Sequence, residues 1–140
     1  MTWCIVQTLS GLTTQKKMMF LPSNINQYYF NIGFMVMKMC QPILNKFDIK
    51  KIINIKTNLY TWWPETDNEA GTHIDHDVEE DYITLIYYIS GSDGGTYVEG
   101  QGKIDKVSNR LIVFDGKTPH RAIYQTNSKT QISTNINIIV

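Results

Sequence analysis

The sequence predicts one mainly β domain, folded as an antiparallel sandwich or barrel. A chain of 140 residues has the usual length of a single domain and can bury one hydrophobic core. From residue 81 onward, short stretches rich in β-branched and aromatic residues alternate with turn sequences, a spacing typical of sandwiches and barrels. We expect residues 1–59 to supply a helical support and the first strands, and residues 60–140 to form the β core.

Composition argues against several classes of function. Lys plus Arg and Asp plus Glu each total 13, so no strong overall field favours nucleic acid or an anionic membrane as a partner. Cys4 and Cys40 lie far apart and form no CxxC motif, which argues against a structural zinc site. The N-terminus does not resemble a secretion signal, and no apolar run is long enough for a membrane span. We therefore expect a cytoplasmic protein.

The segment 24–50 is compatible with a helix. Its apolar residues, several of them Met, follow no clean period, but no proline interrupts the segment before Pro42. We expect Pro42 to break or kink this helix. The methionines are most simply interpreted as residues that fill gaps in the core.

Turn-forming residues separate several expected strands in the second half of the chain. The first expected strand reads YITLIYYI, and the Gly-rich sequence SGSDGG follows it as a turn. Further Gly, Ser, Asn and Pro residues mark the later reversals. The expected strands are 82–89, 96–99, 103–107 and 111–114.

The stretch 129–140 predicts an amphipathic final strand, because strand side chains alternate between two faces. The apolar face holds Ile132, Thr134, Ile136, Ile138 and Val140. The polar face holds Lys129, Gln131, Ser133, Asn135 and Asn137. If the polar face lines a cavity, the apolar face needs a cover, and the N-terminal helical segment is the unassigned material for it.

Three residues suggest a metal site. His73 and Asp75 project to the same side of an extended segment, so an imidazole and a carboxylate can converge on one ion. His120 follows Pro119 just beyond an apolar strand, and a jelly-roll topology can bring it beside the first pair. Two imidazoles and one carboxylate leave the other coordination positions open, which suits non-haem iron. The alternative is a surface His73 and a turn-capping His120.

Six motifs together carry a family resemblance, which covers about residues 60 to 140. They are His73-x-Asp75, YITLIYYIS, Gly94-Gly95-Thr96, NRLIVF from Asn109 to Phe114, Pro119-His120 and Gln131-Ile132-Ser133. In order and spacing they resemble the iron(II) and 2-oxoglutarate dioxygenases of the prolyl 4-hydroxylase type. No motif is specific alone, but the series is.

The resemblance implies a double-stranded β-helix of the jelly-roll, cupin-like kind, with His73, Asp75 and His120 as the ligands of Fe(II). It implies 2-oxoglutarate and O2 as co-substrates, and hydroxylation of a protein or peptide side chain, with proline the first candidate. This short chain resembles small stand-alone members of the family that bacteriophages encode. That resemblance implies the cytoplasm of a host cell as the location.

2-Oxoglutarate is a dianion whose keto acid end chelates iron, so its other carboxylate must meet a cation or several hydrogen-bond donors. In the family this is usually Arg or Lys in an R-x-S pattern, but here the pattern starts with Gln131, which lacks the charge. Lys129 offers a replacement and shares strand parity with Gln131 and Ser133. The resemblance further implies Tyr87 as a hydroxyl donor to this carboxylate, with Thr84 as a weaker candidate.

Aromatic residues precede the expected metal ligands. Tyr60, Trp62 and Trp63 either pack against a substrate or close the end of the barrel. The polar, turn-rich segment 64–72 is a candidate lid.

Three functions stay open on the sequence alone. The first is the iron and 2-oxoglutarate oxygenase. The second is a cupin-like metal-binding protein with other chemistry, or hydroxylation of a small-molecule substrate, either of which Gln131 in place of Arg would favour. The third is a non-catalytic jelly-roll binding module.

Overall fold

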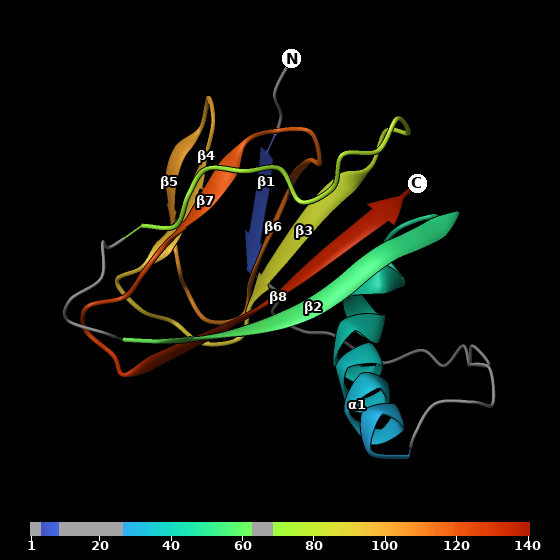
Figure 1. Cartoon of the computed structure of the whole chain (residues 1–140), viewed down its shortest axis with the longest axis horizontal. Coiled ribbons are helices and arrows are strands. Elements are labelled where there is room, and N and C mark those ends of the chain that lie inside the picture. Colours follow the sequence, from blue (N-terminus) through green and yellow to red (C-terminus); the bar gives the residue numbers. More distant parts are fainter. Residues whose placement is uncertain (1–3, 9–26, 63–68) are drawn as a thin grey trace. The chain divides into compact units, whose positions relative to one another are not determined.

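The structure is a computed structural model that describes residues 4–8, 27–62 and 69–140 (Figure 1). The chain divides into two compact units, one holding the described strands and the other the described helix. No helix among these residues is long and apolar enough to cross a membrane. The assignment of the whole chain to one domain stays a prediction.

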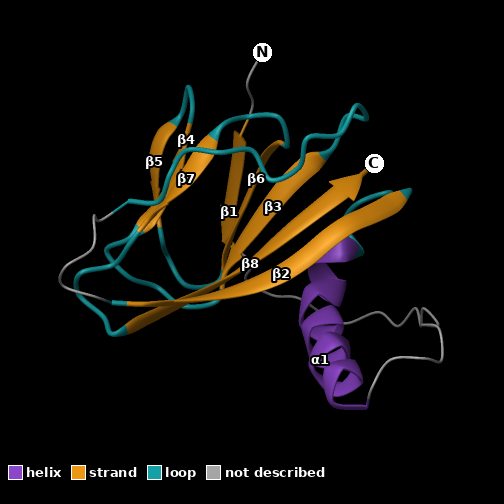
Figure 2. Ribbon diagram, viewed as in Figure 1, coloured by secondary structure: helices purple, strands orange, loops and turns teal. Residues whose placement is uncertain are grey.

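The larger of two antiparallel sheets has the strand order β1-β6-β3-β8-β2 (Figure 2). Its strands are β1 (Cys4–Thr8), β2 (Lys51–Thr61), β3 (Ile83–Tyr88), β6 (Arg110–Asp115) and β8 (Thr130–Ile139). The central strand β3 thus pairs with β6 on one side and with β8 on the other. These neighbours are distant in sequence, so this sheet depends on long-range pairing.

The smaller sheet has the strand order β5-β4-β7. Its strands are β4 (Gly95–Val98), β5 (Gly102–Asp105) and β7 (His120–Ile123). Beyond β7, the segment 69–73 adds two isolated antiparallel bridges, Glu69 with Ile123 and His73 with His120. The small sheet therefore continues into the segment that carries the first expected metal ligands.

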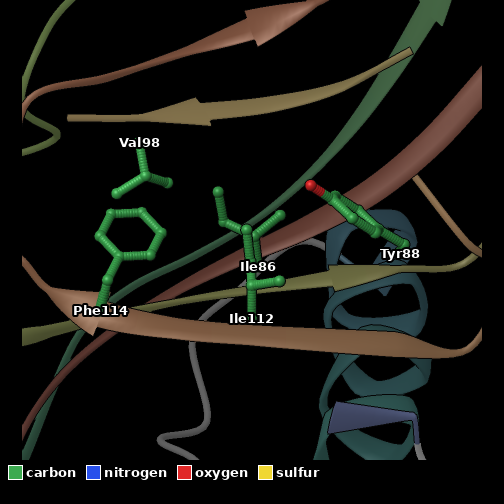
Figure 3. Packing of buried hydrophobic residues seen from close by; sticks show 5 residues of the cluster. All are labelled: Ile86, Tyr88, Val98, Ile112 and Phe114. Carbon is green, nitrogen blue, oxygen red and sulfur yellow. The ribbon is translucent and has the colours of Figure 1, made fainter. Parts of the chain in front are cut away.

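The hydrophobic core draws on both sheets (Figure 3). Its buried residues are Ile86, Tyr88, Val98, Ile112 and Phe114, with Ile104 packed against them. Val98 and Ile104 come from the small sheet and the others from the large sheet. The prediction of a mainly β fold with two antiparallel layers is confirmed, and this arrangement is compatible with a sandwich or jelly roll.

Turns fall where the sequence predicted them. Asn109 has a φ of 62°, and Gly100 and Gly102 have φ values of 78° and 85°. These left-handed conformations suit glycine and, among other residues, asparagine best. Three strands had no specific prediction. They are β1, within the segment 1–59, β2, which begins in that segment and ends at Thr61, and β7, which begins directly after the turn at Pro119.

The predicted helix is α1 (Gln27–Leu44). It continues through Pro42 to Leu44, so the proline does not break it at once. Proline has no amide hydrogen to donate within the helix, and α1 ends two residues after it. Cys40 is fully buried, and burial raises the pKa of its thiol to about 11.

Candidate metal centre

Backbone pairing holds two of the predicted ligands opposite each other. The amide of His73 donates to the carbonyl of His120 at 3.0 Å, and the amide of His120 donates to the carbonyl of His73 at 2.9 Å. This mutual exchange defines a hydrogen-bonded antiparallel pair. The two imidazole rings lie on the same side, with centroids 4.9 Å apart. Asp75 lies two residues after His73, the spacing that places two side chains on the same side of an extended segment.

One nitrogen or oxygen atom from each of His73, Asp75 and His120 lies within 4.8 Å of the others. Asp75 Oδ1 is 3.7 Å from Nε2 of His73 and 3.6 Å from Nε2 of His120. These separations are too long for good hydrogen bonds. Atoms that each lie about 2 Å from one metal ion can be up to about 4 Å apart, so both distances suit shared ligation.

The other ring nitrogens are occupied by backbone carbonyls. Nδ1 of His73 donates to the carbonyl of Gly71 at 2.9 Å, and Nδ1 of His120 donates to the carbonyl of Thr118 at 3.1 Å. This arrangement leaves each Nε2 free to act as a metal ligand, at 3.7 Å and 3.6 Å from Asp75 Oδ1. Histidine ligands of metals are usually oriented by such hydrogen bonds from the second nitrogen.

Burial differs strongly among the three side chains. The side chain of His120 is 3% exposed, that of Asp75 14% and that of His73 50%. Among the described residues, Nε2 of His120 and Oδ2 of Asp75 are buried without a hydrogen-bond partner. His76 Nε2, Arg110 Nε and Gln125 Oε1 also lack a partner, but these two atoms belong to one cluster, where a single bound ion would pair both. A cation bound between them fits this donor set, and the exposed side of His73 gives access to it.

Burial alone would raise the pKa of the Asp75 carboxyl, but its neighbours outweigh that effect. His120 lowers the pKa most, and Asn137 and His73 lower it further, so the value lies below the usual range for aspartate. The carboxylate is therefore ionised near neutral pH, as a metal ligand must be.

Residues around the three ligands fix their positions. The hydroxyl of Tyr82 donates to the carbonyl of His76 at 3.0 Å and accepts from the amide of His76 at 3.1 Å, which holds the chain just after Asp75. Tyr82 packs so closely on Gly116 that a Cβ there would lie 2.1 Å from its ring. The ring of Phe114 meets that of His120 edge-on, with centroids 5.0 Å apart.

A cavity that is partly open to solvent is lined by the two histidines. Its lining residues are Tyr60, His73, Ile86, Tyr88, Gly95, Thr96, Lys106, His120, Ala122, Gln131, Ser133 and Asn135. The polar face of β8 contributes three of these, as the alternation of that strand predicted.

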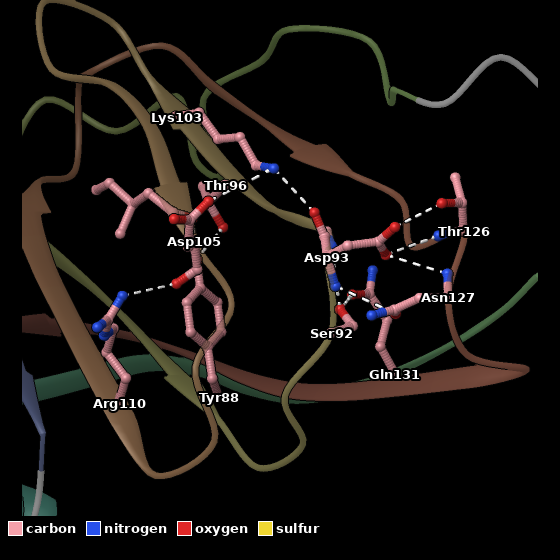
Figure 4. Close-up of polar contacts among 12 residues, drawn as sticks. Tyr88, Ser92, Asp93, Thr96, Lys103, Asp105, Arg110, Thr126, Asn127 and Gln131 are labelled. Atoms are coloured by element: carbon pink, nitrogen blue, oxygen red, sulfur yellow. Dashed lines mark hydrogen bonds and ion pairs between the residues drawn. The ribbon is translucent and has the colours of Figure 1, made fainter.

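Two of the residues expected to bind 2-oxoglutarate line this cavity. Gln131 and Ser133 are both buried in its wall, and Gln131 Oε1 accepts a hydrogen bond from Ser92 Oγ at 3.0 Å (Figure 4). Lys129 does not line the cavity, because it precedes β8 and is exposed to solvent. Strand parity placed it beside Gln131, but that parity holds only inside the strand.

The expected tyrosine also lies elsewhere. Tyr87 pairs with Thr134 across the sheet, and its hydroxyl donates to Asn109 Oδ1 at 2.8 Å, away from the cavity. Its neighbour Tyr88 pairs with Ser133 and lines the cavity instead. The hydroxyl of Tyr88 donates to Thr96 Oγ1 at 2.8 Å (Figure 4). Thr84, the weaker candidate, donates to Asn137 Oδ1.

The structure describes two of the three aromatic residues that precede the expected metal ligands. Tyr60 lines the cavity, and its ring lies 5.5 Å from that of Tyr124. Trp62 is 45% exposed. Trp63 and residues 64–68 of the predicted lid lie outside the described residues.

Lys106 is the main residue of the cavity that the sequence interpretation did not single out. The available signal was its place in the expected strand 103–107, in which it would share a face with Ile104, a residue that packs against the core. A lysine that continues an apolar face is unusual.

Comparisons of the sequence with models of known protein families and with curated proteins found no match.

Proposed function

We propose that the protein is a mononuclear Fe(II) and 2-oxoglutarate-dependent oxygenase that hydroxylates a protein or peptide side chain. The single observation that carries this proposal is the convergence of His73, Asp75 and His120, with unpaired buried atoms facing a common point. Two imidazoles and one carboxylate on one face of an ion are typical of non-haem iron oxygenases, which keep the remaining positions open.

In this proposal the iron would be held by Nε2 of the two histidines and by the carboxylate of Asp75. When bound, iron(II) would supply the redox chemistry that couples oxidative decarboxylation of 2-oxoglutarate to hydroxylation of the second substrate. The chain's own contribution is orientation. The carbonyls of Gly71 and Thr118 fix the imidazoles, and the buried side of the site excludes water around His120.

The strand pairing supports a double-stranded β-helix for this protein. The antiparallel pairs are nested in sequence. Working inward, β2 pairs with β8, the segment 69–73 with β7, β3 with β6, and β4 with β5. Successive pairs alternate between the large and the small sheet. This is the pattern expected when one long hairpin is wound into a two-layered jelly roll.

The exposed side of the site supports a large second substrate. His73 and Tyr60 both line the cavity, the side chain of His73 is half-exposed, and Trp62 is exposed two residues after Tyr60. Aromatic side chains at such an edge bind apolar portions of a peptide well. Proline in a peptide is the first candidate to test.

The test is conversion of 2-oxoglutarate to succinate by the purified protein with added Fe(II), ascorbate and O2. Asp75→Asn should abolish turnover and weaken Fe(II) binding by at least about tenfold, because the variant loses the anionic ligand. Asp77→Asn, which removes an exposed carboxylate two residues away, should leave both unchanged.

A wild-type protein that binds Fe(II) but never consumes 2-oxoglutarate would contradict the oxygenase and leave a metal-binding protein with other chemistry. A protein that binds neither would favour the non-catalytic binding module.

A further inference from the structure

Lys106 is a cation buried in the wall of the cavity. It is 3% exposed and directly follows β5. Its amide donates to the carbonyl of Gly94 at 3.1 Å, and its carbonyl accepts from the amide of Ser92 at 3.0 Å. Because both backbone groups are bonded to the loop between β3 and β4, the backbone of Lys106 is held in place.

No carboxylate pairs with Lys106 anywhere in the described part of the chain. Its Nζ lies 5.2 Å from the ring centroid of Tyr88 and 5.8 Å from that of Tyr60, so cation–π attraction offsets part of the cost of burial. A buried charge without an anion is costly, and proteins keep one mainly where a ligand supplies the counter-charge. Burial lowers the pKa of Lys106 to about 8, which still leaves the side chain mostly protonated at neutral pH.

Neutral donors accompany this cation in the cavity wall. Since Ser92 donates to Gln131 Oε1, the amide nitrogen of Gln131 is the end left to donate to a ligand. Thr96 Oγ1 accepts from Tyr88, so the proton of the Thr96 hydroxyl is left for another acceptor. No acidic side chain lines the cavity among the described residues. The wall therefore suits an anion with several acceptor oxygens.

We propose that Lys106, assisted by the amide of Gln131 and the hydroxyl of Thr96, binds the carboxylate of 2-oxoglutarate that lies farthest from the metal. This inference rests on the proposed function. The charged group that binds this carboxylate is then Lys106, directly after β5, and not Lys129, which directly precedes β8. In this chain the strand that carries Gln131 then supplies a neutral hydrogen bond, and the small sheet supplies the charge.

The test compares two 2-oxo acids of equal length, 2-oxoglutarate and 2-oxopentanoate, which carries a methyl group in place of the distal carboxylate. Their affinities are measured anaerobically with Fe(II) from the charge-transfer absorbance of the chelated keto acid. The wild type should prefer 2-oxoglutarate by at least about thirtyfold, the effect typical of a buried charge pair. Lys106→Met should reduce this preference to a few fold, and so should Lys106→Gln, because both remove the charge.

Lys129→Met is the matched control and should keep the full preference. If Lys106→Met retains the preference, or if Lys129→Met loses it, carboxylate binding by Lys106 is overturned. If the wild type shows no charge-transfer band with either acid, the proposed function fails instead.

In that case, carboxylate binding by Lys106 is tested on metal-free protein with glutarate, which lacks the keto group. Glutarate should raise the melting temperature of the wild type but not of Lys106→Met. No difference between the two would overturn carboxylate binding by Lys106 as well.

Discussion

Lys106 should lower the stability of the protein while serving ligand binding. Below pH 8 the buried ammonium is charged in both the folded and the unfolded chain, so the folded state bears the full cost of burial. Between pH 8 and about 10.5 only the unfolded chain stays charged, and the cost fades. Among the described residues, the aromatic rings near Nζ are those of Tyr60 on β2 and Tyr88 on β3.

We therefore expect Lys106→Met to raise the free energy of unfolding at pH 7 by roughly 1–3 kcal/mol without ligand, because methionine keeps the length and loses the charge. Urea unfolding at pH 7 and at pH 9.5 should show a smaller gain at the higher pH. Lys129→Met should change stability little at either pH, since the residue is exposed. A Lys106→Met variant less stable than the wild type at pH 7 would contradict this reading of Lys106.

Some residues of the candidate site could be predicted from the sequence, and others could not. His73, Asp75 and His120 could be selected because metal ligation demands particular residue types, and the structure brings all three together. Tyr87 and Tyr88 could not be separated, because one residue of register decides which of two adjacent tyrosines faces the cavity. Register depends on pairing with β6 and β8, which no local pattern reveals.

At the scale of single elements, the segment after Asp75 depends on Tyr82. The hydroxyl of Tyr82 is the only side-chain group shown to bond both the amide and the carbonyl of His76 among the described residues. This pair of hydrogen bonds acts as a clamp on a segment without regular secondary structure. The position of Asp75 relative to His120 should therefore be sensitive to the loss of one oxygen atom.

Tyr82→Phe should lower the free energy of unfolding by about 1–3 kcal/mol, because the backbone groups of His76 lose their partner. It should also weaken Fe(II) binding several-fold. Tyr87→Phe is the control, since it removes a hydroxyl bonded to Asn109 on the other face of the sheet. It should leave the affinities for Fe(II) and 2-oxoglutarate unchanged. Equal Fe(II) affinity in Tyr82→Phe and the wild type would show that the clamp does not position Asp75.

Elements with a strong local pattern were predictable. The strands β3 to β6 and β8 combine β-branched residues with turn sequences at their ends, and all five are present. β2 was harder because its sequence mixes exposed Lys and Asn with Ile and does not alternate cleanly. β7 has four residues, and its strand character comes from pairing with β4.

For the whole molecule, the metal should join the segment 73–75 to the start of β7 and so stabilise the fold. Ligands that bind only the folded state add about 2.7 kcal/mol when present at a hundred times their dissociation constant. We expect Fe(II) under anaerobic conditions to raise the melting temperature by several degrees, and 2-oxoglutarate to raise it further only when the metal is present. His120→Ala should remove both shifts, whereas Asp77→Asn, at an exposed position outside the three candidate ligands, should retain them.

We expect His73, Asp75 and His120 to bind one metal ion together. Anomalous diffraction at the iron absorption edge, from crystals grown anaerobically with Fe(II), would locate that ion. It should show one iron per chain, bonded to Nε2 of both histidines and to the carboxylate of Asp75. Iron bound elsewhere, or a refined structure in which His120 lies apart from His73 and Asp75, would contradict this expectation.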